Sequence, residues 1–342
     1  MRPRSLPSLE PELPMRDWNR LANKSLAGAP PTRGEALAVL EASDDELLPV
    51  LQAAFRVRHR YHGREVRIHV LRNAKSGLCP EDCVFCSQSV KFPTGVERYP
   101  LQSVEELVAG ARDAAAAGAV KYCMVTSTRG PSERDLDVIC MAVRQIKAEL
   151  TINVCTSLGL LREGQAERLA AAGVTRFNHN LESSRAHFPE VCSTHSYDDR
   201  VATVRAAKAA GMEACCGGIM GMGESLGDRV SLAFELRELE VESIPVNFLD
   251  PRPGTPLGAS ARLTPQDCLR ALAMFRFVNP SRDIRVAGGR EGNLRHLQPL
   301  ALFPANSLFS DGYLTTPGQG RDADLRMIAD LGFRIAELAP AV

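Results

Sequence analysis

The sequence lacks the features that mark membrane, secreted and nucleic-acid-binding proteins. No run among its 342 residues approaches the roughly 18 apolar residues of a membrane-spanning helix. Lys and Arg together number 41, as do Asp and Glu, so no excess charge attracts nucleic acid or an anionic membrane. The proline-rich N-terminus has no apolar signal segment, and its acids Glu10 and Glu12 are untypical of a transit peptide. These absences predict a cytoplasmic protein without membrane or nucleic-acid partners.

The common motifs of side-chain catalysis are also missing. The seven histidines do not cluster, and neither a Ser/His/Asp arrangement nor a phosphate-binding Walker loop stands out. No catalytic side chain is therefore assigned. What the chain does have is ten cysteines. Without a secretory signal, these are expected to be reduced thiols that are available to metal.

Three of the cysteines, Cys79, Cys83 and Cys86, fall within eight residues at spacings of four and three. A structural zinc site needs four ligands, usually in two separated pairs, and a ferredoxin loop has a fourth cysteine. Three thiolates can hold three irons of a [4Fe-4S] cluster and leave the fourth iron open to a substrate. The loop therefore predicts a four-iron cluster that takes part in chemistry.

Downstream of this loop, strand patterns alternate with helix patterns, which predicts a parallel sheet. The expected strands are 66–70, 122–126, 152–156, 176–181, 213–217, 244–249, 284–287 and 307–309. The expected helices are 103–117, 133–148, one that ends at 172, 197–210, 225–239, 265–277, 294–302 and 322–331. Eight alternations predict an α/β fold of the (β/α)8 TIM-barrel type over residues 65–342. Residues 17–64 are predicted to form an N-terminal helical extension, and residues 1–16 a disordered tail.

In such barrels the chemistry lies at the C-terminal ends of the strands, which is where the cysteine loop follows the first strand. Three further strands carry Cys123, Cys155 and Cys215, and the seventh carries Arg285. Side chains alternate along a strand, so these four converge inside the barrel if they all point inward. They predict a second metal site, and Cys216 is expected to point the other way.

The fourth strand carries Asn178, Asn180 and Glu182 at one parity, which predicts a polar inner face. Amides and a carboxylate suit ribose hydroxyls and a urea ring, and Asn247 on the sixth strand is a further candidate. The alternative is that this face meets solvent at the strand end. His179 has the opposite parity, which favours a structural role. The glycines of the segment 217–223 would let the backbone approach a ligand closely.

The CxxxCxxC loop, with Phe85 before its last cysteine, resembles that of the radical S-adenosylmethionine (SAM) enzymes. The match extends to residues 74–83, 178–181, 216–219, 221–224, 285–290 and 314–317, which are similar to the biotin synthase family. The resemblance implies a homodimeric barrel enzyme that inserts sulfur into dethiobiotin at C9 and C6. It also implies an external one-electron donor of flavodoxin-like or ferredoxin-like type.

Carried over residue by residue, the resemblance assigns Cys79, Cys83 and Cys86 to the [4Fe-4S] cluster. It assigns Cys123, Cys155, Cys215 and Arg285 to an auxiliary [2Fe-2S] cluster. Asn180 and Glu182 match positions that contact the ribose of SAM, and Asn178, Asn180 and Asn247 match positions near dethiobiotin. The chain departs from the family in having Glu182 for the usual Asp, Lys121 for a familiar Arg, and Cys216 where many relatives have Ser.

Three alternatives remain open at the level of sequence. The chain could be another radical SAM enzyme of the same barrel type that acts on a different small molecule. It could instead be an iron–sulfur electron carrier, although a carrier needs neither a large barrel nor an open iron. The third alternative is a zinc-stabilised binding protein.

Overall fold

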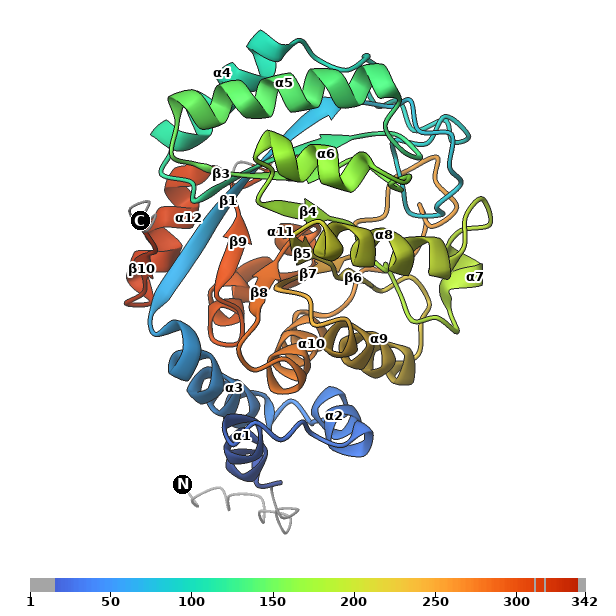
Figure 1. The fold of residues 1–342 in the computed structure, drawn as a ribbon. Coiled ribbons are helices and arrows are strands. Elements are labelled where there is room, and N and C mark those ends of the chain that lie inside the picture. Colours follow the sequence, from blue (N-terminus) through green and yellow to red (C-terminus); the bar gives the residue numbers. More distant parts are fainter. Residues whose placement is uncertain (1–15, 311, 317, 338–342) are drawn as a thin grey trace, which may run out of the picture.

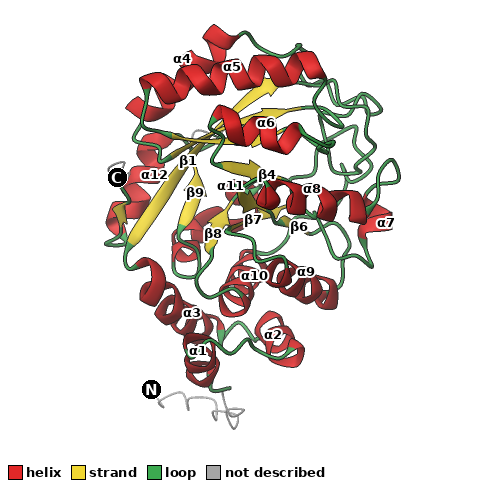
Figure 2. Ribbon diagram, viewed as in Figure 1, coloured by secondary structure: helices red, strands yellow, loops and turns green. Residues whose placement is uncertain are grey.

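The computed structural model describes residues 16–310, 312–316 and 318–337, so the predicted tail lies outside the described residues except for Arg16. Within these ranges, parallel strands close a barrel with helices around it (Figures 1 and 2). The barrel strands are β1 (Glu65–Lys75), β2 (Lys121–Thr126), β3 (Asn153–Ser157), β4 (Arg176–Asn178), β5 (Glu213–Cys215), β7 (Ser243–Phe248), β8 (Asp283–Val286) and β9 (Ser307–Phe309). Strand β1 pairs with β2 on one side and with β9 on the other, which completes the ring. The predicted (β/α)8 fold is confirmed.

The fifth barrel strand is broken. A short strand, β6 (Gly218–Met220), follows β5 and pairs with β7. At the break, a Cβ atom on Gly217 would lie 1.9 Å from the carbonyl oxygen of Pro245, so only glycine fits. A Cβ atom on Gly218 would lie 2.5 Å from the carbonyl oxygen of Glu182. These two glycines therefore admit neighbouring backbone, whereas the sequence suggested that they admit a ligand.

The helix layer contains α4 (Val104–Ala116), α5 (Glu133–Glu149), α6 (Gln165–Ala172), α7 (Phe188–Val191), α8 (Tyr197–Ala209), α9 (Leu226–Glu238), α10 (Pro265–Val278), α11 (Arg290–Leu294) and α12 (Arg321–Asp330). The long helices begin where a hydroxyl caps them. Residues Ser103, Ser132, Ser196, Ser225 and Thr264 each accept a hydrogen bond from the backbone N–H three residues later. A remaining short strand, β10 (Arg334–Ile335), pairs with the start of β1.

The N-terminal extension consists of α1 (Trp18–Leu26), α2 (Arg33–Leu40) and α3 (Leu47–His62). These helices pack against α9 and α10 on the outside of the barrel, below them in the view of Figure 1. Trp18, Val39 and Val50 share one hydrophobic core with barrel residues such as Ile244 and Val246. The extension therefore covers the side of the barrel.

Besides the fifth strand, which was expected over 213–217 but ends at Cys215, two predicted elements were wrong in part. The fourth strand was expected to reach residue 181, but β4 ends at Asn178 because the chain turns there. Glu182 has a φ of +69°, a left-handed conformation that no strand contains. The segment 294–302 was expected to be an α-helix but forms a 3₁₀ helix, η1 (Arg295–Leu302). Pro299 lies inside it and has no N–H to donate.

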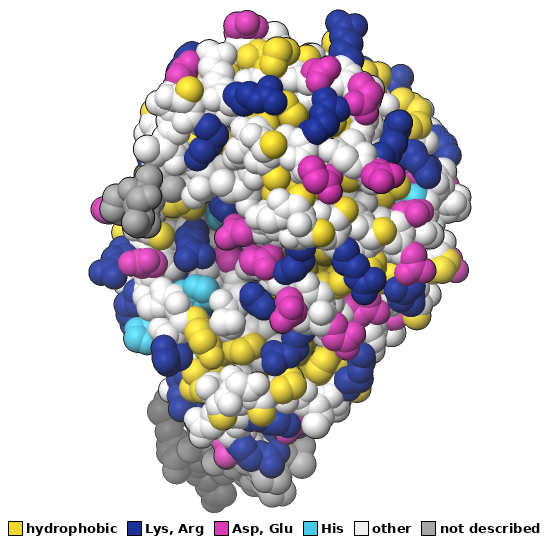
Figure 3. All heavy atoms as spheres, viewed as in Figure 1, with side chains coloured by type: hydrophobic (Ala, Val, Ile, Leu, Met, Phe, Trp, Pro, Cys, Tyr) yellow, Lys and Arg dark blue, Asp and Glu magenta, His cyan; other side chains and the backbone are white. Residues whose placement is uncertain are grey.

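The surface agrees with the balanced composition. On the face shown in Figure 3, basic and acidic side chains are interspersed. Among the described residues, no helix combines the length and the apolar character that crossing a membrane requires.

Candidate active site

One large cavity opens at the C-terminal ends of the barrel strands. The side chains around it include all eleven residues that the sequence nominated: Cys79, Cys83, Cys86, Cys123, Cys155, Cys215, Arg285, Asn178, Asn180, Glu182 and Asn247. The three-cysteine loop contributes to the mouth, and the strand cysteines line the interior. The fold thus brings both cysteine sets to one cavity.

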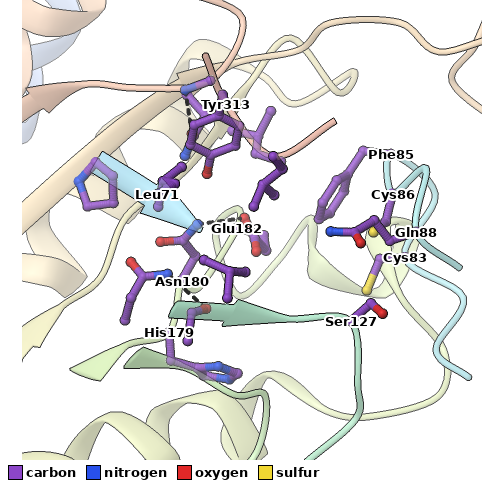
Figure 4. A pocket seen from close by; sticks show the side chains of 18 of the residues that line it. Leu71, Cys83, Phe85, Cys86, Gln88, Ser127, His179, Asn180, Glu182 and Tyr313 are labelled. Atoms are coloured by element: carbon purple, nitrogen blue, oxygen red, sulfur yellow. Dashed lines mark hydrogen bonds between the residues drawn. The ribbon is translucent and has the colours of Figure 1, made fainter. Parts of the chain in front are cut away.

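The three-cysteine loop is held by its own backbone. Cys79 donates its N–H to the carbonyl of Gln88 at 3.2 Å, and its carbonyl accepts from the N–H of Val90 at 2.9 Å. The N–H of Cys86 bonds to the carbonyl of Cys83 at 2.9 Å. These bonds fold residues 79–90 into a compact loop, with Cys83 and Cys86 beside Phe85 and Gln88 at the cavity wall (Figure 4).

The two acids between the cysteines tie this loop to the segment after α7. The carboxylate of Asp82 accepts the backbone N–H groups of Ser193 and Thr194 at 3.0 and 3.2 Å, together with the Ser193 hydroxyl. Burial raises the pKa of Asp82, but these hydrogen bonds outweigh it and hold that pKa well below its usual range. Glu81 accepts from Thr194 and pairs with His195. The acids therefore position the cysteines.

Cys192 was assigned no role from the sequence, yet it lies next to Cys83 of the three-cysteine loop. The Sγ atoms of Cys83 and Cys192 and a ring nitrogen of His195 all lie within 4.8 Å of one another. A hydrogen bond between the two thiols raises the pKa of Cys83 and lowers that of Cys192 to about 4. Burial raises the pKa of Cys86 to about 12, so iron must displace a proton when it binds.

Arg200 on α8 is a second residue that the sequence did not single out. Its guanidinium donates to the carbonyl of Asn180 at 2.8 Å and lies 3.8 Å from the Cys83 sulfur and 3.5 Å from a Glu182 carboxylate oxygen. The ring of His195 accepts from its Nε at 2.9 Å, which fixes the side chain. A buried cation therefore lies between the cysteine loop and the polar side of the cavity that carries Asn180 and Glu182.

The polar wall consists of Asn178 at the end of β4 and of Asn180 and Glu182 in the segment after it; Figure 4 shows Asn180 and Glu182. The Asn180 amide bonds to the N–H of Gly217 at 3.1 Å and to Glu182 at 3.4 Å. Asn178 donates to the Ser157 hydroxyl at 3.2 Å. Glu182 is buried in its left-handed turn, and burial raises the pKa of its carboxyl while nearby Arg200 opposes that shift. An unusual backbone at a buried carboxyl in a cavity is typical of a binding site.

Asn247 reaches the cavity from β7 with both ends of its amide engaged. It donates to the carbonyl of Gly218 at 3.1 Å and accepts the N–H of Gly288 at 2.9 Å. His179 also lines the cavity, although the sequence favoured a structural role, and its buried Nε2 has no partner among the described residues. The alternation of strand faces does not apply to His179, because β4 ends before it.

Deeper in the barrel, the cysteines of β2, β3 and β5 and Arg285 of β8 form a second set. Cys123 and Cys155 are cross-strand neighbours. Arg285 donates to the Cys215 sulfur at 3.4 Å and to the Ser243 hydroxyl at 2.8 Å. A hydrogen bond from Cys123 lowers the pKa of Cys155, with Arg176, Lys121 and Arg285 contributing as nearby cations. Cys216 instead packs in the hydrophobic layer outside the barrel interior, as predicted.

Both sets fit the iron–sulfur groups that the sequence suggests. Thiolates are the ligands of such clusters, and each set offers three around one cavity. In the deeper set, the buried Nε atom of Arg285 has no hydrogen-bond partner among the described residues. Such an orphaned polar atom beside three thiols is expected where a bound group completes the site.

A barrel with a three-cysteine loop after its first strand defines a radical SAM enzyme. A family model described as Radical SAM superfamily matches residues 73–236. The solved structure of a methylornithine synthase aligns with a TM-score of 0.82 at 20% identity over 93% of this chain and 97% of that one. The FeFe-hydrogenase maturase HydG from Carboxydothermus hydrogenoformans aligns at 0.80, with 16% identity over 94% of this chain and 80% of its own. At these identities the alignments support the fold alone.

The particular family follows from closer relatives. A model described as Biotin and Thiamin Synthesis associated domain matches residues 245–334. The biotin synthase of Salinibacter ruber is 59% identical over 93% of this chain and 89% of its own length, and that of Rhodopirellula baltica is 53% identical over the same shares. The biotin synthase of Bacillus cytotoxicus is 49% identical over 94% of this chain and 97% of its own. The chain belongs to the biotin synthase family.

Proposed function

We propose that the chain inserts sulfur into dethiobiotin to form biotin, with its two cysteine sets in separate roles. Cys79, Cys83 and Cys86 would hold a [4Fe-4S] cluster at the mouth, and Cys123, Cys155, Cys215 and Arg285 a [2Fe-2S] cluster inside. When bound, the four-iron cluster and SAM would supply a 5′-deoxyadenosyl radical that abstracts hydrogen from dethiobiotin. The auxiliary cluster would supply the sulfur atom that is inserted. The protein contributes binding, orientation and exclusion of water.

The observation that carries this proposal is that one cavity holds both thiol sets with a polar wall along it. An electron carrier would need no such cavity. A zinc-stabilised protein would have no use for two separate sets of three thiols around a shared space. The polar wall would then bind SAM and dethiobiotin between the two metal groups.

The wall offers matching groups for the ribose and the carboxylate of SAM and for the urea ring of dethiobiotin. Glu182 would accept hydrogen bonds from the ribose hydroxyls, and Asn180 would hold Glu182 in place. Arg200, 3.8 Å from Cys83, would receive a carboxylate of SAM bound at the mouth. Asn178, Asn180 and Asn247 would face dethiobiotin, whose urea ring matches amide donors and acceptors.

The deciding experiment is an anaerobic assay of the iron-loaded protein with dethiobiotin, SAM and dithionite. Biotin and 5′-deoxyadenosine are the expected products. A protein that makes 5′-deoxyadenosine but leaves dethiobiotin unchanged would contradict the proposed substrate. Absence of both products from protein with its full iron and sulfide would contradict the proposed radical chemistry.

Replacing Glu182 by glutamine is expected to weaken SAM binding by roughly 1.5–3 kcal/mol, because a charge-assisted hydrogen bond to the ribose is lost. Calorimetric titration of SAM into anaerobic protein measures this change. The matched control is Glu190→Gln on the exposed surface of α7, which should leave the affinity unchanged. Equal SAM affinities of Glu182→Gln and the unmodified protein would place the ribose elsewhere.

The proposal includes a homodimer and an external one-electron donor of flavodoxin-like or ferredoxin-like type. Light scattering of the purified protein tests the dimer, and a scattering mass of one chain would contradict it. A donor is required because the reductive cleavage of SAM to a 5′-deoxyadenosyl radical consumes one electron. The donor should replace dithionite in the assay.

A further inference from the structure

The floor of the barrel, below the deeper cysteines, is built from charged residues. Lys121 precedes Cys123 by two residues on β2, and Glu213 precedes Cys215 by two on β5, so each pair shares a strand face. Arg176 on β4 is the register partner of both Cys155 and Glu213. Barrel interiors are usually filled by branched apolar side chains, so a charged layer here needs a reason.

Glu213 joins the two cations of this floor. Its Oε2 accepts from the Lys121 ammonium at 2.9 Å and from Nε of Arg176 at 2.8 Å. Lys121 and Arg176 both line the cavity, and their side chains are only 9% and 6% exposed. The Glu213 side chain is 46% exposed. One half-exposed carboxylate therefore lies between solvent and two cations that face the deeper thiols.

The floor is thin. Two residues along a strand advance roughly 7 Å, so the cysteine layer lies one side-chain layer above Glu213. Glu213 is half exposed, whereas Lys121 and Arg176 are buried, so turning Glu213 into solvent leaves buried cations that favour another anion in its place. Arg176 also contacts Asp283 at 3.4 Å, which keeps the guanidinium in place when Glu213 moves away.

We propose that this floor is a gated access route for hydrosulfide, through which the auxiliary site receives sulfur. The inference rests on the proposed function, because it presumes that the deeper thiols hold a sulfur-donating cluster. A small monoanion suits Lys121 and Arg176 when Glu213 moves away, because Asp283 then remains as the only carboxylate paired with Arg176 among the described residues. The route reaches the deeper thiols from the end of the barrel opposite the mouth, where SAM and dethiobiotin would bind. No bond forms at the floor, which binds and passes the anion.

The test follows cluster formation rather than turnover. Cluster-free, full-length protein is rebuilt anaerobically with ferrous iron and sodium sulfide near neutral pH, and Mössbauer spectra follow the two clusters separately over time. Glu213→Ala should form the auxiliary cluster roughly fivefold faster than the unmodified protein, which corresponds to about 1 kcal/mol. The four-iron cluster should form at an unchanged rate. Lys121→Glu should slow the auxiliary cluster, because it makes the floor anionic.

Glu65→Ala is the matched control. Glu65 lies at the same end of the barrel, is 48% exposed and pairs with Arg334 at 3.0 Å, but Arg334 does not line the cavity, whereas the partners of Glu213 do. It should leave both rates unchanged. If Glu213→Ala fails to fold, Glu213→Gln keeps the side-chain size, loses the charge and should also accelerate auxiliary cluster formation.

The outcomes separate the gate from the proposed function. Unchanged rates of auxiliary cluster formation in the Glu213 variants, or equal acceleration by Glu65→Ala, would overturn the gate. The proposed function would still stand if the unmodified protein forms an auxiliary cluster. Equal acceleration of both clusters would also overturn the gate. Failure of the unmodified protein to form any auxiliary cluster would overturn the proposed function and the gate with it.

Discussion

Replacing Cys83 by alanine is expected to remove the four-iron cluster and to abolish 5′-deoxyadenosine formation. The loop offers three thiolates and no spare ligand, and Cys83 is the most buried of the three. Loss of one ligand leaves two irons without a protein ligand, and no other cysteine belongs to this loop. Iron and sulfide analysis of anaerobic protein, with chromatography of the nucleoside product, measures both losses.

The neighbouring thiol of Cys192 calls for a specific control. It lies within 4.8 Å of the Cys83 sulfur, so the double variant Cys83→Ala/Cys192→Ala is compared with the single one. Cys140→Ala, a buried cysteine on α5 away from the cavity, should keep both clusters. If the double variant still cleaved SAM at the unmodified rate, the three-cysteine assignment would be wrong.

Much of the barrel could be predicted because its signals are local. The five long helices of the outer layer begin at a hydroxyl cap, and the strands alternate with helices along the chain. Side-chain parity then sufficed to predict that Cys123, Cys155 and Cys215 face one interior. The same parity was available for Lys121 and Glu213, two positions before Cys123 and Cys215. Once the barrel is assumed, the same strand parity therefore also predicts that Lys121 and Glu213 face the barrel interior.

The end of β4 could not be predicted, because its cause is not local. Leu181 and Glu182 donate their N–H groups to the carbonyl of Gly217, at 2.9 and 3.2 Å, and Gly218 leaves room for the Glu182 carbonyl. The left-handed turn at Glu182 thus depends on a strand more than thirty residues away. Asn180 and Glu182 reach the cavity through this turn and not, as strand parity predicted, from a continuous strand.

No local sequence signal marks Cys192, His195 and Arg200, because their positions also depend on segments that are distant in sequence. Cys192 and His195 lie on a loop whose position is set by Asp82 of the cysteine loop, more than a hundred residues earlier. Arg200 has the pattern of an ordinary helix residue, since it follows Asp198 and Asp199 in the first turn of α8. Only the packing of α8 beside the mouth makes it a buried cation between Cys83 and Glu182.

Replacing Cys155 by alanine is expected to remove the auxiliary cluster while the four-iron cluster remains. Cys155 lies on β3, inside the barrel, and the mouth ligands belong to a loop with its own hydrogen bonds. Such a protein should still cleave SAM to 5′-deoxyadenosine but should form no biotin. Its matched control is Cys216→Ala, because the Cys216 thiol is buried in the outer hydrophobic layer and should not affect either cluster.

Arg285 should behave differently from the cysteines. A guanidinium is normally protonated and has no lone pair to offer, so it must lose a proton before it can bind iron. Here Asp283 and Ser243 hold it at 3.2 and 2.8 Å, and the Cys215 sulfur raises its pKa although burial alone would lower it. Arg285→Met should therefore keep more auxiliary iron than Cys155→Ala does. Iron counts and visible spectra of the two variants, purified anaerobically side by side, give this order. Biotin formation by Cys155→Ala at the unmodified yield would show that sulfur comes from another source, whatever Arg285→Met retains.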